Sequence, residues 1–205
     1  FSEVQGQYVG QTVRFNGTLR PLRAGQLDGV LTGQQIDLPL FLESFPSVNV
    51  SGLEGRMNLN AKIQGPLTDL VISGESQLQP VSWYGVVADG AQAKFRYSIS
   101  QRLLSLWVNA DDCLGGRMSS TLTVLAGASA TELNGSVELR SATALPKTPT
   151  AAVSGLYDLV ADLGGNTQLL SVKTRVEPAA LQIYQQSVES CQGTWFRQAG
   201  SWEYF

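Results

Sequence analysis

The side chains that could support catalysis or bind a metal are few and scattered in this sequence. The chain contains no histidine, so it lacks the commonest general base and the commonest metal ligand. The densest group of candidate ligands is Asp111-Asp112-Cys113, which stands just before Gly115-Gly116. Acidic residues next to glycines are typical of a turn at a strand end. We therefore predict a turn here, with no catalytic residue, metal site or cofactor, and no enzymatic activity.

Two other pairs of reactive side chains also indicate structure rather than chemistry. Asp158 and Asp162 share one face of a predicted strand, but no acid or base partner accompanies them, so we interpret them as a solvated edge. Cys113 and Cys191 are far apart and form no CxxC motif. A disulfide between them requires an oxidising compartment and a fold that brings them together; two unpaired thiols are the alternative.

Composition and charge exclude some partners. The 205 residues carry a net charge of −3, and only 15% are charged. Lysine and arginine occur singly, without the basic stripe that neutralises phosphates, so we expect no nucleic-acid partner. No stretch approaches the roughly 20 apolar residues of a membrane-spanning helix. Because the chain begins with Phe1, we expect it to be an internal or C-terminal fragment of a longer protein, with any membrane anchor outside it.

The elements that would position these residues are predicted by an alternation of period two. From Leu53 to Ile63, apolar or small residues occupy every odd position and polar residues every even one. Such alternation sends the two sets to opposite faces of a strand. The same pattern recurs at residues 13–19, 72–78, 93–99, 104–110, 118–124, 133–139, 153–163 and 170–176. The best helix candidate is Pro178 to Glu189, which also fits a strand, and residues 144–151, with two prolines, are the best loop.

The chain also repeats itself weakly. Leu53-Glu-Gly-Arg-Met57 is similar to Leu114-Gly-Gly-Arg-Met118, and alternate residues from Gly155 to Gly165 match those from Gly55 to Gly65. Approximate repeats therefore start at 53, 114 and 153. Their spacing is uneven, which argues against a solenoid of fixed period. We predict one elongated β-repeat region over residues 1–205.

A sheet with one apolar face must cover that face, and this sequence offers almost no helix to do so. A β-sandwich, a closed barrel and a sheet curled lengthwise into a groove remain. Several glycines, such as Gly17 and Gly74, fall at positions that face the interior, where they leave room or permit bending. This favours an all-β, elongated, curved antiparallel or mixed sheet with an apolar interior. A β-sandwich, in which the same residues form a closed core, is the alternative. The residues that we expect to line the groove are Leu53, Met57, Leu59, Ile63, Ile72, Leu78, Phe95, Tyr97, Ile99, Met118, Leu122, Val124, Val137, Leu139, Tyr157, Leu159 and Leu163.

The string Ile63-Gln-Gly-Pro-Leu-Thr-Asp-Leu-Val-Ile-Ser-Gly74 resembles the repeat of the TamB family. These bacterial envelope proteins are subunits of the translocation and assembly module and are related to AsmA-like proteins. The similarity extends over most of Leu53 to Val176. The sequence departs from the family at Leu70, where proline often follows the acidic residue.

This resemblance implies a β-taco, a sheet folded into a trough, in the periplasmic region of an inner-membrane-anchored protein. It implies a role in outer-membrane biogenesis. The partners would be phospholipid acyl chains or unfolded outer-membrane protein strands, together with an outer-membrane barrel of the TamA or BamA kind. With about 14 strands near 4.8 Å apart, such a trough would be on the order of 65 Å long.

A sandwich-type adhesion or carbohydrate-binding module is the alternative function. Such a module would need an aromatic platform, which Trp83, Trp107, Trp195 and Trp202 could supply. Trp107 falls on the opposite side from the apolar residues of its own strand.

Overall fold

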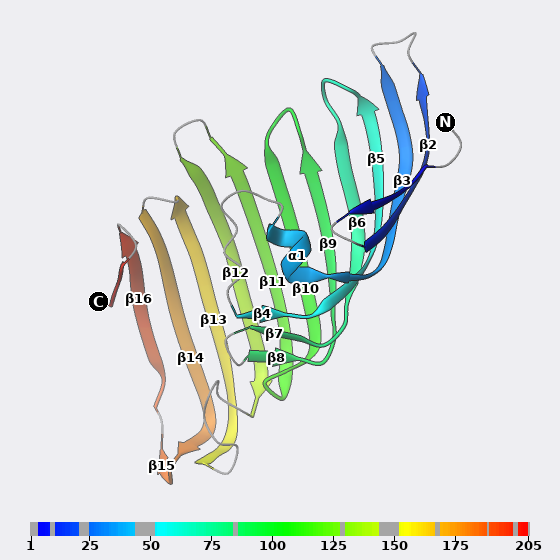
Figure 1. Ribbon diagram of the computed structural model, residues 1–205. Helices are drawn as coiled ribbons and strands as arrows, with labels where there is room; N and C mark the ends of the chain where they lie inside the picture. Colours follow the sequence, from blue (N-terminus) through cyan, green and yellow to red (C-terminus); the bar gives the residue numbers. More distant parts are fainter. Residues whose placement is uncertain are drawn as a thin grey trace.

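The computed structural model describes residues 4–8, 11–20, 25–43, 52–83, 86–127, 130–143, 152–166, 169–187, 189–198 and 201–204. Within these ranges the fold is almost entirely β: a single 17-stranded sheet and one short helix, α1 (Leu38–Glu43). The prediction of an all-β curved sheet is confirmed (Figure 1). No helix in the described part of the chain is long and apolar enough to span a membrane.

The strands follow the predicted alternating stretches closely. They are β1 (Val4–Tyr8), β2 (Gln11–Arg20), β3 (Gln26–Asp37), β4 (Leu53–Glu54), β5 (Arg56–Pro66), β6 (Val71–Leu78), β7 (Val81–Trp83), β8 (Val86–Ala88), β9 (Ala91–Ser98), β10 (Leu103–Cys113), β11 (Gly116–Ala126), β12 (Thr131–Ala142), β13 (Val153–Asn166), β14 (Leu169–Ile183), β15 (Gln186–Ser187), β16 (Cys191–Gln198) and β17 (Ser201–Tyr204).

Thirteen of these strands form one antiparallel row, which we call the main wall. Its order is β1-β2-β3-β5-β6-β9-β10-β11-β12-β13-β14-β16-β17. Twelve spacings of about 4.8 Å make this wall about 58 Å long. The expectation of about 65 Å is therefore slightly too high, because β4, β7, β8 and β15 lie beyond the ends of the longer strands and do not extend the row.

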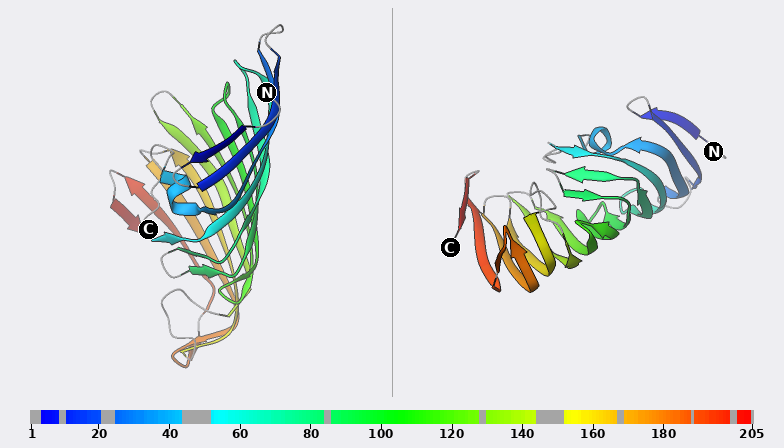
Figure 2. Two further views of the ribbon diagram at one scale, coloured as in Figure 1. Left: turned by 45° about the vertical axis from the view of Figure 1, so that its right-hand side comes forward. Right: turned by 90° about the horizontal axis from the view of Figure 1, so that it is seen from below.

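Strands β4, β7 and β8 build a second, smaller wall that faces the first. Chain continuity through Gly55, Gln79-Pro80 and Asp89-Gly90 joins β4 to β5, β6 to β7 and β8 to β9. In turn β4 pairs with β7, β7 with β8, and β8 with the end of β10. Seen from below, these strands and α1 form a layer over one face of the main wall (Figure 2). We call the line at which the sheet turns between the two walls the crease.

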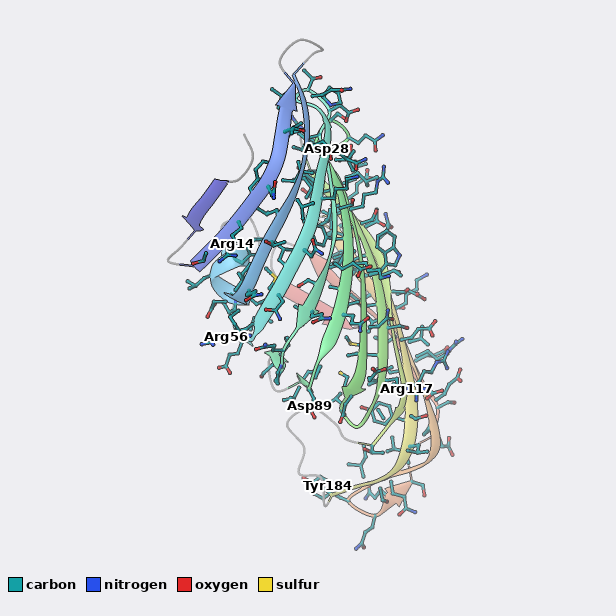
Figure 3. All side chains as sticks on the ribbon, turned by 90° about the vertical axis from the view of Figure 1, so that its right-hand side faces the viewer. Arg14, Asp28, Arg56, Asp89, Arg117 and Tyr184 are labelled. Carbon is teal, nitrogen blue, oxygen red and sulfur yellow. The ribbon has the colours of Figure 1, made fainter. Side chains whose placement is uncertain are left out.

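Bulges mark the crease along the sheet. One extra residue is inserted in β3 between Gly33 and Ile36, in β10 between Ala110 and Cys113, and in β12 between Leu139 and Ala142. A bulge bends its strand and increases its local twist. Arg56 and Asp89, which flank the crease, lie at the lower ends of the main-wall strands in Figure 3.

The buried core lies at the crease and divides into two clusters. The N-terminal cluster contains Ile36, Leu38, Met57, Leu59 and Ala61, with Phe41, Leu53 and Val81 packed on it from α1 and the second wall. The C-terminal cluster contains Ala88, Ala110, Cys113, Leu139, Ala142, Tyr157 and Leu181. These residues are all small or apolar apart from the phenol of Tyr157, and burying their surface is the main stabilising contribution.

The structure corrects or qualifies four points of the sequence-based prediction. The β-sandwich alternative is wrong, because the strands belong to one sheet. The segment from Pro178 to Glu189 is not helical: β14 continues to Ile183, and a hairpin at Tyr184-Gln185 leads into β15. The unexpected helix α1 begins after Asp37, whose carboxylate Oδ1 accepts a hydrogen bond from the Leu40 N–H at 3.1 Å, as a helix N-cap does. The predicted loop at 144–151 lies outside the described residues.

Candidate functional site

The antiparallel register aligns the inward-facing side chains of the main wall in rows that cross the strands. We call two of these rows, both on the part of the inner face away from the crease, the apolar strip. The row farther from the crease contains Ile63, Ile72, Tyr97, Leu104, Val124, Leu133, Gly165 and Leu170. The next row contains Phe15, Leu31, Ala61, Gly74, Phe95, Leu106, Leu122, Gly135, Leu163 and Val172.

The large side chains of the strip are less buried than Met57 and Leu139 beside the crease. Met57 and Leu139, in the row beside the crease, are 4% and 5% exposed. By contrast, the large side chains of the strip are half-buried. Part of its N-terminal portion, including Ile72 and Phe95, packs against the N-terminal cluster. Over β11 to β14, Leu122, Val124, Leu133, Leu163 and Val172 belong to neither cluster. This portion of the strip is therefore apolar surface of the inner face that is only half-buried and lies outside both clusters.

A row of smaller side chains runs between the strip and the crease. It contains Gly33, Leu59, Ser76, Ala93, Val108, Ser120, Val137, Ala161 and Thr174. Val137 is 37% exposed although it faces inward. Ser76 is buried, and its hydroxyl has no hydrogen-bond partner within the described structure. The polar side chains of these rows are the hydroxyls of Ser76, Ser120 and Thr174 and the phenol of Tyr97, and the other side chains are apolar.

Most of the predicted groove-lining residues share this inner face. Fourteen of them occupy the rows just described or the row beside the crease: Met57, Leu59, Ile63, Ile72, Leu78, Phe95, Tyr97, Met118, Leu122, Val124, Val137, Leu139, Leu159 and Leu163. Tyr157 lies beyond the crease in the C-terminal cluster, and Leu53 packs on the N-terminal cluster from β4.

Ile99 is placed differently. It lies in the turn after β9 and is 40% exposed. Its N–H donates to the Leu70 carbonyl at 3.0 Å, and its own carbonyl accepts from the Arg102 N–H at 3.3 Å. The chain reverses there, so the alternation that includes Phe95 and Tyr97 no longer fixes the direction of this side chain.

Other strip residues were not among the predicted lining residues, notably Leu31, Leu104, Leu106, Leu133 and Val172. Those in β10, β12 and β14 show the same period-two alternation as the residues that were included. This signal is sufficient to find them, because each faces inward through the regular register of its own strand.

The thiol and acidic side chains considered as candidate ligands lie in β10 and β16. Cys113 is a free thiol, 2% exposed, and burial, with a smaller contribution from the charge of Asp112, raises its pKa. Cys191 is in β16, five strand spacings along the sheet from β10, and its side chain lies outside the described structure. Asp111 and Asp112 are exposed in the bulge of β10. Among the described residues, no group of three or more His, Cys, Asp or Glu side chains could hold a metal ion.

Asp158 is not the solvated edge residue that the sequence suggests. Its Oδ1 accepts a hydrogen bond from the Ser141 N–H at 2.7 Å, and its Oδ2 accepts one from Arg140 Nη1 at 3.0 Å. These bonds, the Ser141 bond first, lower the pKa of the Asp158 carboxyl below its usual value. Asp162 is exposed and stands opposite Lys173 in the register.

Comparison with known proteins finds no match to a family model, a curated protein or a solved structure. The resemblance to the TamB family rests on the amino-acid sequence alone.

Proposed function

We propose that the apolar strip binds the acyl chains of phospholipids. On this proposal the protein is a non-enzymatic transport scaffold of the bacterial envelope. The observation that carries the proposal is the portion of the strip over β11 to β14, where large apolar side chains face inward, are only half-buried and belong to neither buried cluster.

The energetic argument is that an acyl chain supplies the contacts that the strip lacks. Each buried methylene contributes roughly 0.8 kcal/mol. The row of the strip that runs from Ile63 to Leu170 crosses the strands from β5 to β14, a distance of about 34 Å at seven strand spacings. Because apolar attraction is not directional, such a surface holds a chain without fixing one position along its length. These properties suit transfer of lipid along the sheet better than storage at one point.

The cellular location and the protein partners that the resemblance to the TamB family implies belong to the same proposal. It places the chain in the periplasm, within an inner-membrane-anchored protein that acts with an outer-membrane barrel of the TamA or BamA kind. Unfolded outer-membrane protein strands are the second class of client, since they carry one apolar face and could pair with an open sheet edge.

Site-specific photocrosslinking tests the lipid proposal. A photoreactive phenylalanine derivative would replace Leu122 or Leu163 in the strip. Thr121 and Asp162 are matched controls, because each is the chain neighbour of a test position and faces outward. With phospholipid vesicles carrying a labelled acyl chain, we expect lipid adducts at the two leucine positions and several-fold fewer at the two controls.

A third position separates the strip from the core. Leu59 is 7% exposed and lies in the N-terminal cluster, so we expect it to crosslink within the protein. Equal lipid yields at Leu122 and Thr121, or adducts confined to the protein at both leucine positions, would refute the proposal.

A further inference from the structure

Trp107 is a large aromatic side chain that the core does not use. It lies in β10 on the face opposite the strip, which we call the outer face, and it is 44% exposed. Its strand neighbours on this face are Ser105 and Asn109, and the residues directly across from it are Lys94 and Thr121. The diagonal positions hold Gln92, Arg96, Ser119 and Thr123. On the outer face, the indole of Trp107 is thus surrounded by side chains that can form hydrogen bonds.

The polar surroundings continue from Trp107 as a track across the sheet. The register places Trp107, Thr121, Ser136, Asp162 and Lys173 in one outward row. The hydroxyls of Thr121 and Ser136 lie 3.2 Å apart. Four strand spacings separate the two ends of this row, a distance of about 19 Å.

The far end of the track opens into a hollow. Six outward-facing residues of β13, β14 and β16 line it: Val160, Asp162, Lys173, Arg175, Gln192 and Thr194. The lining offers carboxylate, ammonium, guanidinium, amide and hydroxyl groups within one concave surface. A site of this kind presents both hydrogen-bond donors and acceptors to an uncharged polar ligand.

Most of the positive charges along the track lie beside a negative charge, and Arg96, which lies between Ser73 and Ser105 in the register, is the exception. Lys94 Nζ lies 3.0 Å from Glu75 Oε1, and Arg175 Nε lies 3.0 Å from Glu177 Oε1. Lys173 is directly opposite Asp162 in the register. A polyanion such as a nucleic acid requires an excess of positive charge, and the single aromatic ring does not suit a lipid chain. The balance favours a neutral ligand.

We infer that the outer face binds a neutral glycan chain, with one sugar ring stacked on Trp107 and its neighbours hydrogen-bonded along the track toward the hollow. The indole covers the apolar C–H face of a pyranose ring, while hydroxyl and amide side chains bind its rim. An extended glycan presents hydroxyl groups along its length, and the track presents polar side chains beyond Trp107 over about 19 Å. This inference is independent of the lipid proposal, because the two surfaces lie on opposite faces of the sheet.

Titration with two neutral hexasaccharides tests the inference: β-1,4-linked glucose and β-1,4-linked N-acetylglucosamine. Binding is measured by amide chemical shifts of the 15N-labelled protein. We expect at least one of them to shift the amides of Trp107, Thr121, Ser136 and Lys173. Trp107→Thr should weaken this binding by about tenfold or more, because it removes the ring on which the sugar stacks. Trp107→Phe retains a ring and should restore part of the affinity.

Leu125→Thr is the matched control, because Leu125 is also outward-facing and is 39% exposed, but lies at the end of β11 away from the track. It should leave glycan binding unchanged. The far-ultraviolet circular dichroism of each variant verifies that the sheet is intact. If neither hexasaccharide shifts these amides, or if Trp107→Thr binds as tightly as the original protein, the inference is wrong. Lipid crosslinking at Leu122 should be the same in Trp107→Thr, so each proposal can fail without the other.

Discussion

Ser141 and Gln35 show how single residues shape the crease. Both have positive φ angles, 55° and 54°, in the bulges of β12 and β3. In each bulge the freed N–H donates to a side chain of the next strand of the main wall. The partner of Ser141 is Asp158 at 2.7 Å, and the partner of Gln35 is Asn58 at 2.9 Å. These local hydrogen bonds offset the cost of a backbone conformation that residues other than glycine seldom adopt.

Asp158 should make the stability of the protein depend on pH. Its pKa is lower in the folded state than the ordinary value of 3.8, chiefly because of the Ser141 and Arg140 hydrogen bonds. The carboxylate therefore stabilises the fold above pH 3.8, and this contribution decreases as the pH falls through the folded-state pKa. We expect Asp158→Asn to be slightly less stable at pH 7, by less than about 1 kcal/mol because the side chain is partly exposed.

Thermal melting between pH 2 and pH 7 measures this effect. The melting curves of the original protein and Asp158→Asn should converge as the pH falls, because the protonated aspartic acid resembles the amide. Asn58→Ala is a useful control, since it removes the corresponding cap from the β3 bulge without removing a titrating group. A gap between the original protein and Asp158→Asn that stays constant over the whole range would contradict the role of the carboxylate.

The buried Ser76 hydroxyl gives a second prediction at this scale. It is 5% exposed and has no partner in the described structure. A buried polar group without a hydrogen bond costs about 1–3 kcal/mol. We expect Ser76→Ala to raise the free energy of unfolding by about 1 kcal/mol in chemical denaturation. Ser120→Ala is the control, because Ser120 lies in the same row but is less buried; a loss of stability in Ser76→Ala would show that the hydroxyl is in fact satisfied.

At the scale of elements, alternation predicts the strands well but does not predict where they bend. The alternation from Leu53 to Ile63 is unbroken in the sequence, yet the chain divides at Gly55, with φ 144°, into β4 and β5 on different walls. Bulges in β3 and β12 carry Gln35 and Ser141 at positive φ, where no glycine marks the site. Each bulge is stabilised by a hydrogen bond to a side chain on the next strand, which no local pattern contains.

The weak repeat has a structural counterpart at its glycines. Gly65 and Gly165, aligned in the sequence, have φ angles of 123° and 127°. A Cβ at either position would lie within 2.6 Å of a carbonyl oxygen, that of Asp69 or Leu169. Glycine is therefore required where β5 turns toward β6 and where β13 turns toward β14. The sequence could show this correspondence because a residue type, rather than a long-range contact, determines it.

The candidate site was predictable in part for the same reason. Alternation identifies the residues that share the inner face, because register preserves the face along each strand. It cannot identify which of them are covered. Met57 and Leu122 have the same kind of alternating surroundings in the sequence, but α1 and the second wall pack over the cluster that contains Met57. That difference depends on which strand ends fold back at the crease.

At the scale of the whole molecule, the two ends of the chain lie at opposite ends of a long sheet (Figure 1). Each main-wall strand pairs chiefly with its immediate neighbours, and the buried residues form two clusters rather than one. The N-terminal cluster draws its buried residues from β3, α1 and β5, whereas the C-terminal one draws them from β8, β10, β12, β13 and β14. Such an arrangement resembles a linear array, in which stability is a sum of local terms and neighbour interfaces.

Two core substitutions, one in each cluster, should therefore have local effects. Ile36→Ala and Leu181→Ala remove side chains that are 1% and 2% exposed, and each should cost about 2–5 kcal/mol of local stability. Hydrogen exchange measured by mass spectrometry should show faster exchange in β12 to β14 for Leu181→Ala, with β3 and β5 still protected, and the reverse for Ile36→Ala. If either variant loses protection evenly from β3 to β14, the sheet unfolds as one unit. The long row of backbone hydrogen bonds would then couple the two clusters more strongly than their separate packing implies.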